Sequence, residues 1–312
     1  MAPKIRTTSR DADIVRLLNP ERYTYLPSNW ISALVGGNEF RFAKRLRLLS
    51  DGLPERTVAG NKNEPRPGLG YLARHFEFYR HRVYSRTEKG DTFVNEPNPH
   101  RSKQPFAHQV LQDLVHASIE LGAKHPDFEL IDWPKLRDLG WTERGQQKYV
   151  PDKTLSHEDP HLIRLPSGRK SRGDGAPFLL KHGKGQLFVL AKEIDRGTEP
   201  LTTTHESRRN IKQKLLQYKE VFDSDLYREH YGFPNSIVMF VFTRESRLAS
   251  FLELAKDAEI FGAKGRCPYI VGYHWKDWAN ERSYPPATDY IFTEAGKRLG
   301  YPDFRLSKFW EA

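Results

Sequence analysis

Residues 187 to 199 read LFVLAKEIDRGTE. The apolar run that opens this stretch predicts a buried β-strand, and two carboxylates, Glu193 and Asp195, appear as the strand ends. Because the side chains at positions i and i+2 of a strand point the same way, we expect these two acids to lie side by side. Asp152 ends another short extended run upstream. The three acids are therefore candidates for a single site.

Two interpretations of these acids follow from the residues alone. Glu193 and Asp195, joined by Asp152 from a neighbouring strand, would supply the oxygen ligands that Mg²⁺ or Mn²⁺ prefers, and such an ion lowers the pKa of a bound water. Alternatively, Asp195 caps the turn into the next helix and Glu193 pairs with an arginine. Acids at strand ends mostly serve the second purpose, so spacing alone favours it.

The segments around this strand alternate between helical and strand patterns. Apolar residues recur with a helical period over residues 106–121, and a near-continuous apolar run over 236–243 is typical of a strand buried on both faces. Further helices are predicted over 208–222 and 246–258, and further strands over 128–131, 148–155, 179–180, 186–194 and 269–273. This order predicts an α/β fold, an α/β sandwich with a mixed sheet.

Two short helices across a glycine-containing turn characterise the N-terminal region. We expect the first within residues 26–37, capped at Ser28 or Asn29 and stopped by glycine, and the second over 39–49, with a shorter helix before them over 13–18. The second helix would turn apolar residues inward and four basic residues outward, namely Arg41, Lys44, Arg45 and Arg47. This arrangement is the helix-turn-helix pattern.

A segment rich in Gly, Pro, Asn and Lys follows at residues 57–70 and precedes an extended segment at 71–79. A hairpin with a basic tip, carrying Lys62 and Arg66, would make this region a winged helix-turn-helix that binds double-stranded DNA. The alternative is a helical hairpin whose basic side chains face solvent. The placement of charge and the wing-like loop favour DNA binding.

The net charge of +10 is unevenly spread. Residues 1–104 hold 19 Lys and Arg against 11 Asp and Glu, whereas residues 105–312 hold 31 against 29. This asymmetry favours an N-terminal half that meets a polyanion. We therefore divide the chain into a disordered basic tail, a winged helix-turn-helix, a polar linker and a second domain, at residues 1–12, 13–85, 86–105 and 106–312.

Several classes of protein are disfavoured by the sequence. The one cysteine, Cys267, allows no internal disulfide and excludes a cysteine-based zinc motif. No apolar run reaches the roughly 18 residues of a membrane span, and the N-terminus lacks the apolar region of a secretory signal. Walker and dinucleotide-binding glycine loops are absent. We expect a cytoplasmic protein without a membrane partner.

A second basic segment lies between Gly168 and Gly175. Its cations are Arg169, Lys170 and Arg172. We expect a mobile loop beside the acids that contacts DNA backbone phosphates. The alternative is a solvated hairpin tip.

Three blocks of sequence resemble the plasmid replication-relaxation family: VPD at residues 150–152, KEIDRGTE at 192–199 and KLLQY at 214–218. The resemblance covers most of the chain, and the acidic EIDRGTE block is its specific part. It implies a winged helix at the N-terminus and a C-terminal domain of restriction-endonuclease-like type, with the PD-(D/E)xK nuclease fold. Related relaxases of mobilisable plasmids nick DNA at a transfer origin.

Carried over residue by residue, the resemblance implies that Asp152 and Glu193 bind a metal, with Asp113 as a further candidate ligand. Asp195 stands where the nuclease motif has its lysine. Lys212 or Lys214, on the following helix, would then supply the ammonium group, and Tyr218 lies one turn beyond Lys214 on the same face.

The resemblance thus implies a DNA-binding protein of plasmid replication or mobilisation type that nicks DNA with Mg²⁺ or Mn²⁺. The missing lysine of the motif leaves an alternative. In it, the chain is a non-catalytic DNA-binding regulator of replication or copy number that retains a nuclease-like scaffold.

Overall fold

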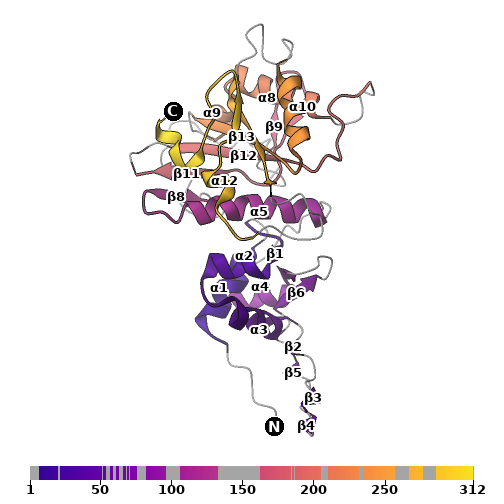
Figure 1. Cartoon of the computed structure of the whole chain (residues 1–312), viewed down its shortest axis with the longest axis vertical. Coiled ribbons are helices and arrows are strands. Elements are labelled where there is room, and N and C mark those ends of the chain that lie inside the picture. The colour runs from indigo at the N-terminus through magenta and orange to yellow at the C-terminus, as the bar shows by residue number, and fades with distance from the viewer. Residues whose placement is uncertain are drawn as a thin grey trace. The chain divides into compact units, whose positions relative to one another are not determined.

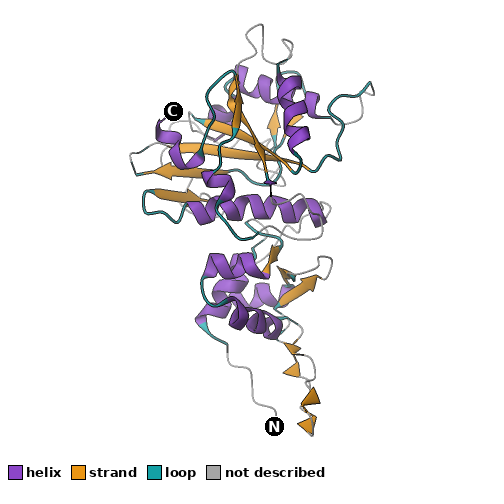
Figure 2. Cartoon of the chain, in the orientation of Figure 1, coloured by secondary structure: helices purple, strands orange, loops and turns teal. Residues whose placement is uncertain are grey.

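A computed structural model describes residues 7–19, 22–50, 52–53, 57–58, 61–62, 66–67, 69, 71–75, 82–95, 106–132, 162–183, 185, 187–204, 210–231, 235–256, 267–276 and 286–311. The chain divides into two units (Figures 1 and 2). The N-terminal unit comprises Met1–Leu121 and Asn280–Thr288, and the sheet unit comprises Gly122–Ala279 and Asp289–Ala312. The helix over residues 106–121, which was expected to open the second domain, falls in the N-terminal unit.

The N-terminal unit contains helices and a small antiparallel sheet. Its helices are α1 (Ser9–Leu17), α2 (Ser28–Val35), α3 (Glu39–Leu49), α4 (Glu88–Val94) and α5 (Phe106–Gly122). Its three-stranded sheet has the order β1-β7-β6, formed by Leu26–Pro27, Val83–Arg86 and Leu72–His75. The apolar side chains of Ile14, Trp30 and Leu46 are fully buried and form part of its core. The expected pair of helices is confirmed by α2 and α3.

Two expectations for this unit are corrected. Helix α1 begins at Ser9, inside the expected disordered tail, because Thr8 and Asp11 form a capping box. Helix α4 occupies part of the expected linker, where the Thr87 side chain accepts a hydrogen bond from the backbone N–H of Gly90. Gly90 packs against the Tyr71 carbonyl so closely that a Cβ atom would lie 2.4 Å from its oxygen. Only glycine fits there.

The basic helix α3 also differs from expectation. Its buried face is formed by Phe42, which is 4% exposed, with Leu46 and Leu49. Arg45 does not face outward, because it pairs with the buried carboxylate of Asp11 through a 2.6 Å bond from its Nε. Arg41 and Lys44 are exposed as expected.

Between α3 and β6 the backbone forms two antiparallel strand pairs. β2 (Gly52–Leu53) pairs with β5 (Arg66–Pro67), and β3 (Thr57–Val58) pairs with β4 (Asn61–Lys62). Both pairs follow one register, with Leu53 opposite Arg66 and Val58 opposite Asn61. The predicted wing segment therefore contributes β3, β4 and β5 to these pairs, which belong to sheets separate from the one that holds β6 and β7.

A six-stranded mixed sheet organises the sheet unit and confirms the expected α/β fold (Figure 2). Its order is β15-β14-β13-β12-β11-β8, with strands at Lys297–Leu299, Cys267–His274, Ser236–Phe242, Leu187–Asp195, Phe178–His182 and Phe128–Ile131. β12, β13 and β14 are parallel, and the outer pairings are antiparallel. A separate hairpin joins β9 (Ile163–Arg164) to β10 (Lys170–Ser171).

The central sheet is buried on both faces. Helices α8 (Ile211–Asp223), α9 (Leu226–Tyr231) and α10 (Glu245–Ala255) cover one face, where Leu215 and Phe251 pack with Phe240 of β13 (Figure 1). On the other face, α12 (Tyr290–Thr293) and the 3₁₀ helix η2 (Leu306–Glu311) contribute aromatic rings. Because side chains alternate along β12, its odd-numbered residues point toward α8 and α10.

Candidate functional site

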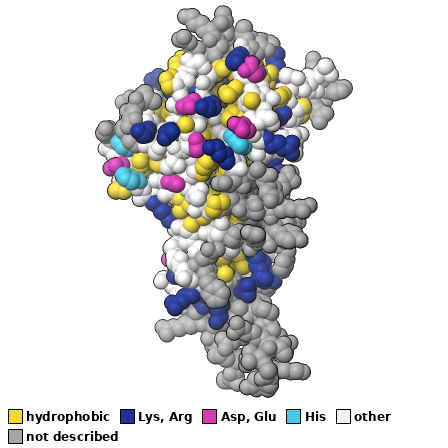
Figure 3. All heavy atoms as spheres, in the orientation of Figure 1, with side chains coloured by type: hydrophobic (Ala, Val, Ile, Leu, Met, Phe, Trp, Pro, Cys, Tyr) yellow, Lys and Arg dark blue, Asp and Glu magenta, His cyan; other side chains and the backbone are white. Residues whose placement is uncertain are grey.

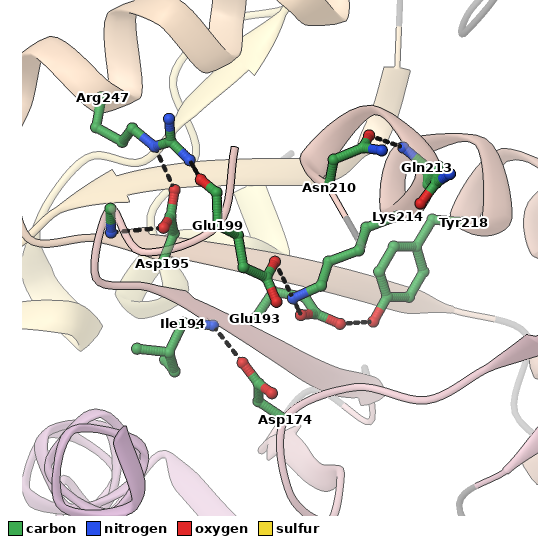
Figure 4. Close-up of polar contacts among 11 residues, drawn as sticks. Asp174, Glu193, Ile194, Asp195, Glu199, Asn210, Gln213, Lys214, Tyr218 and Arg247 are labelled. Atoms are coloured by element: carbon green, nitrogen blue, oxygen red, sulfur yellow. Dashed lines mark hydrogen bonds and ion pairs between the residues drawn. The ribbon is translucent and has the colours of Figure 1, made fainter. Parts of the chain in front are cut away.

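Glu193 and Asp195 share the α8 and α10 face of β12, as the sequence predicted (Figure 4). Their side chains are 4% and 3% exposed, so neither is a surface acid. They nevertheless have different partners. Glu193 faces α8, whereas Asp195 faces α10.

Both oxygens of Glu193 accept hydrogen bonds from α8. Lys214 Nζ donates to Oε2 at 2.9 Å, and the Tyr218 hydroxyl donates to Oε1 at 2.6 Å. These two donors are four residues apart, so one face of the helix presents both. The Asn210 side chain caps the helix by accepting a hydrogen bond from the backbone N–H of Gln213 at 2.9 Å. The cap fixes where the first turn begins.

Burial dominates the titration of Glu193 and raises its pKa to about 7. Lys214 opposes this shift, Asp174 adds to it, and the hydrogen bond from Tyr218 opposes it. Burial also raises the pKa of Tyr218 well above its ordinary value, and Glu193 raises it further, so the phenol stays protonated and donates. Burial disfavours the charged form of Lys214, but Glu193, Asp174 and Glu199 outweigh it and raise the lysine pKa.

Asp174 is a member of the site that the sequence analysis missed. Its backbone N–H donates to the Lys192 carbonyl at 2.8 Å, and its Oδ2 accepts from the Ile194 N–H at 2.7 Å, which extends the β11–β12 pairing. A Cβ atom on the preceding Gly173 would lie 3.4 Å from the Tyr218 hydroxyl. The basic loop thus contributes an acid, set between two glycines, to the Glu193 site.

Asp195 and Glu199 are tied together by Arg247 of α10. Arg247 Nε donates to Asp195 Oδ2 at 2.6 Å, and its guanidinium also donates to the Glu199 carbonyl oxygen. Asp195 Oδ1 accepts a hydrogen bond from the Gly197 N–H at 2.6 Å, within a turn where Gly197 has a φ of 76°. The Glu199 carboxylate lies 3.0 Å from Lys214 Nζ. Asp195 therefore caps a turn, as the non-metal interpretation of the acids predicted. That interpretation also predicted an arginine partner for Glu193, but the arginine pairs with Asp195 instead.

The other predicted catalytic and metal-binding residues lie elsewhere. Lys212 is two residues from Lys214, on the opposite side of α8, and its N–H donates to the Leu201 carbonyl at 2.9 Å. Asp113, in the N-terminal unit, accepts hydrogen bonds from Tyr25 N–H at 2.7 Å and Gln109 Nε2 at 3.0 Å. Asp152 lies outside the described residues.

The predicted DNA-binding residues fall on several elements. Lys62 and Arg66 belong to β4 and β5, Arg47 is half-buried on α3, and Lys170 and Arg172 are exposed. Arg169 pairs with Glu220 of α8 at 3.0 Å, and the Ser167 N–H donates to Glu220 at 2.6 Å. This pairing holds the β9–β10 turn against α8. Figure 3 shows Lys and Arg side chains over the part of the visible face that belongs to the N-terminal unit, with few acids among them.

The carboxylates around Lys214 match Mg²⁺ and Mn²⁺ in donor type. Within the described ranges, however, no group of three or more His, Cys, Asp or Glu side chains is arranged to hold a metal ion. Mg²⁺ commonly takes only one or two carboxylates, with water and substrate phosphate completing its shell. The site fits that sparser arrangement in its donor chemistry.

None of the helices described is at once long and apolar enough to cross a membrane. A scan against models of known protein families found no match, and searches of curated proteins and of solved structures found none either.

Proposed function

We propose that the chain is a DNA-binding protein of plasmid replication or mobilisation type, whose sheet unit nicks DNA with Mg²⁺ or Mn²⁺. The observation that carries the proposal is the group formed by Glu193, Lys214 and Asp174 at the end of the central strand. In the six-stranded sheet, β8, β11 and β12 are antiparallel neighbours, and α8 and α9 then connect β12 to the parallel strand β13; this arrangement supports a restriction-endonuclease-like core.

The site's composition supports phosphodiester chemistry. One ammonium group, from Lys214, faces the carboxylates of Glu193, Asp174 and Glu199, so a divalent cation would improve the charge balance. Such an ion, when bound, polarises a phosphoryl oxygen and generates hydroxide from water. Lys214 occupies the role of the motif's missing lysine and would stabilise negative charge on the phosphate. Tyr218 fixes the rotamer of Glu193.

The N-terminal unit supports DNA binding. Apart from the short strands β2 to β5, the succession α1, β1, α2, α3, β6 and β7, with sheet order β1-β7-β6, is similar to that of a winged helix-turn-helix and supports this proposal. In that arrangement α3 is the recognition helix, and it exposes Arg41 and Lys44. Replacing both by Ala should weaken duplex binding and reduce its dependence on salt.

One observation favours the non-catalytic alternative. Both oxygens of Glu193 are already occupied by donors from α8, and Asp195, in the position of the motif's lysine, is bound to Arg247. A chain that retained this fold as a scaffold would keep such internal bonds and lose the need for an ion.

A nicking assay distinguishes the two. With supercoiled plasmid and Mg²⁺ or Mn²⁺, we expect open circles from the wild type and roughly 100-fold slower nicking from Glu193→Gln. Glu229→Gln on α9 removes an exposed carboxylate and serves as the matched control. Equal rates for wild type and Glu193→Gln, or no nicking with either ion, would refute the proposed nicking activity. The non-catalytic DNA-binding alternative would then remain.

A further inference from the structure

The three parallel strands of the sheet end in register at one edge. Asp195 of β12 lies opposite Phe242 of β13, which lies opposite His274 of β14. The ladder continues beyond the strands, because the Thr243 N–H donates to the Asp195 carbonyl and the Trp275 N–H donates to the Phe242 carbonyl at 2.9 Å. The edge is therefore held by backbone hydrogen bonds up to its last residues.

Each of these strands gives way to a basic residue within one ladder position of its neighbours, with Arg196 level with Thr243 and with Arg244 level with Lys276. The last laddered residues, Asp195, Thr243 and Trp275, are at most 8% exposed. The residue directly after each is basic: half-buried Arg196, exposed Arg244 and exposed Lys276. Among the described residues, none of these three cations has an ion-pair or side-chain hydrogen-bond partner.

Most of the acids on the same edge form ion pairs with other basic residues. Asp195 pairs with Arg247, and both Glu193 and Glu199 pair with Lys214. Among the described residues, Glu245, the first residue of α10, is an exposed acid that adjoins the row. Helices α8 and α10 also begin near this edge, and the positive ends of their dipoles add to its potential.

We propose that Arg196, Arg244 and Lys276 form a row that holds a DNA backbone by its phosphates beside the Glu193 site. Neighbouring strands are about 4.8 Å apart, so the row spans about 10 Å, the axial length over which one strand of duplex DNA places about three phosphates. The row rests on the proposed function, since it would present DNA to Glu193 and Lys214. Its contacts carry no base specificity.

The test is the salt dependence of binding to a fluorescein-labelled DNA duplex by the full-length chain. Replacing Arg196, Arg244 and Lys276 by Ala removes three phosphate contacts. We expect the slope of log K against log salt to fall by about 2.7, and affinity near 0.1 M salt to fall roughly 100-fold.

A matched control removes three other cations of the sheet unit. Lys219, Arg228 and Lys256 lie in the second half of α8, on α9 and directly after α10, and each pairs with an acid on or beside its own helix. Their triple Ala variant loses the same charge, and we expect it to keep the wild-type slope. Equal slopes for the two triple variants would overturn the row while leaving the proposed function standing. A wild-type chain that binds no DNA would overturn both.

Discussion

Two buried carboxylates, one in each unit, face a basic residue from a neighbouring helix, and their pKa values move in opposite directions. Asp11 pairs with Arg45, and although burial raises its pKa, hydrogen bonds from Arg45 and Thr8 lower it below the usual value. Glu193 pairs with Lys214, yet its pKa rises to about 7. An opposite charge at hydrogen-bond distance is therefore not enough to fix the charge state of a buried acid.

The difference lies in the donors and the neighbours. Asp11 accepts from the Thr8 N–H at 2.6 Å, from the Thr8 hydroxyl at 2.9 Å and from two nitrogens of Arg45. Among the described residues, Glu193 accepts two bonds, one from Lys214 and one from Tyr218; it is buried and is repelled by Asp174. The first carboxylate is satisfied as an anion and stabilises the fold. The second can change its charge near neutral pH, which suits a site that works on a ligand.

The largest expected effect is a difference in nicking rate between variants of Lys214 and Arg45, the basic partners of Glu193 and Asp11. Lys214→Met should slow plasmid nicking by roughly 100- to 1000-fold, because it removes the ammonium group that would face the phosphate. Arg45→Met should leave the nicking rate per folded molecule within about twofold, since Arg45 serves packing and charge pairing in the other unit. Nicking rates corrected for the folded fraction by circular dichroism measure both. A rate for Lys214→Met equal to that of Arg45→Met would contradict the comparison.

The pH dependence of stability should have opposite signs at the two acids. Glu193 has a raised pKa in the folded state, so its contribution is favourable below about pH 4.5 and is lost as pH rises to about 7, a change of about 3 kcal/mol. Asp11 has a lowered pKa, so its contribution is present above about pH 4 and is lost as pH falls further. Urea unfolding of wild type, Glu193→Gln and Asp11→Asn across this range measures both slopes.

The Glu193→Gln variant should lack the decline between about pH 5 and 7 that the wild type shows. An identical decline in both proteins would assign it to other groups and would remove the basis for a switchable Glu193.

The Arg45–Asp11 pair itself should show a somewhat smaller stability effect. Arg45→Met leaves the buried Asp11 carboxylate without its main cation, and we expect a loss of about 2 kcal/mol, reduced because the Arg45 side chain is 27% exposed. Arg41→Met, at an exposed position on the same helix, should cost less than about 0.5 kcal/mol. Denaturant midpoints at neutral pH compare the two. Equal midpoints would show that the pair adds no net stability.

The smallest expected effect concerns Asp174. Asp174→Asn removes a negative charge beside Glu193, so the pKa of Glu193 should fall and the pH midpoint of nicking should move to lower pH. The Asn side chain can still accept the hydrogen bond from the Ile194 N–H, which keeps the loop in place. A midpoint that moves upward would exclude the repulsion between the two acids.

The sequence predicts those parts of the fold that depend on local patterns. The apolar runs of β12 and β13 identify buried strands because both faces of the central sheet are covered. Lys214 and Tyr218 could be placed on one face because they are one helical turn apart. The spacing of Thr8 and Asp11 in the sequence also fits a capping box, which would have placed the predicted start of the first helix at Ser9.

The missed features depend on contacts between distant segments. Asp174 reaches Glu193 only because β11 pairs antiparallel with β12 in a particular register. Arg247 comes 52 residues after Asp195, and no local sequence pattern around either residue predicts that they pair. Arg45 looked like one of four equivalent basic residues, and it turns inward because α1 supplies a buried acid.

Hydrogen bonds hold the connection between β12 and α8 at both of its ends. Arg247 closes the segment from Asp195 to Glu199, and the N–H groups of Ile211 and Lys212 donate to the carbonyls of Pro200 and Leu201. Extra residues inserted between 196 and 200 would break these hydrogen bonds and misplace Lys214. The length of this short segment therefore sets the position of Lys214 relative to Glu193.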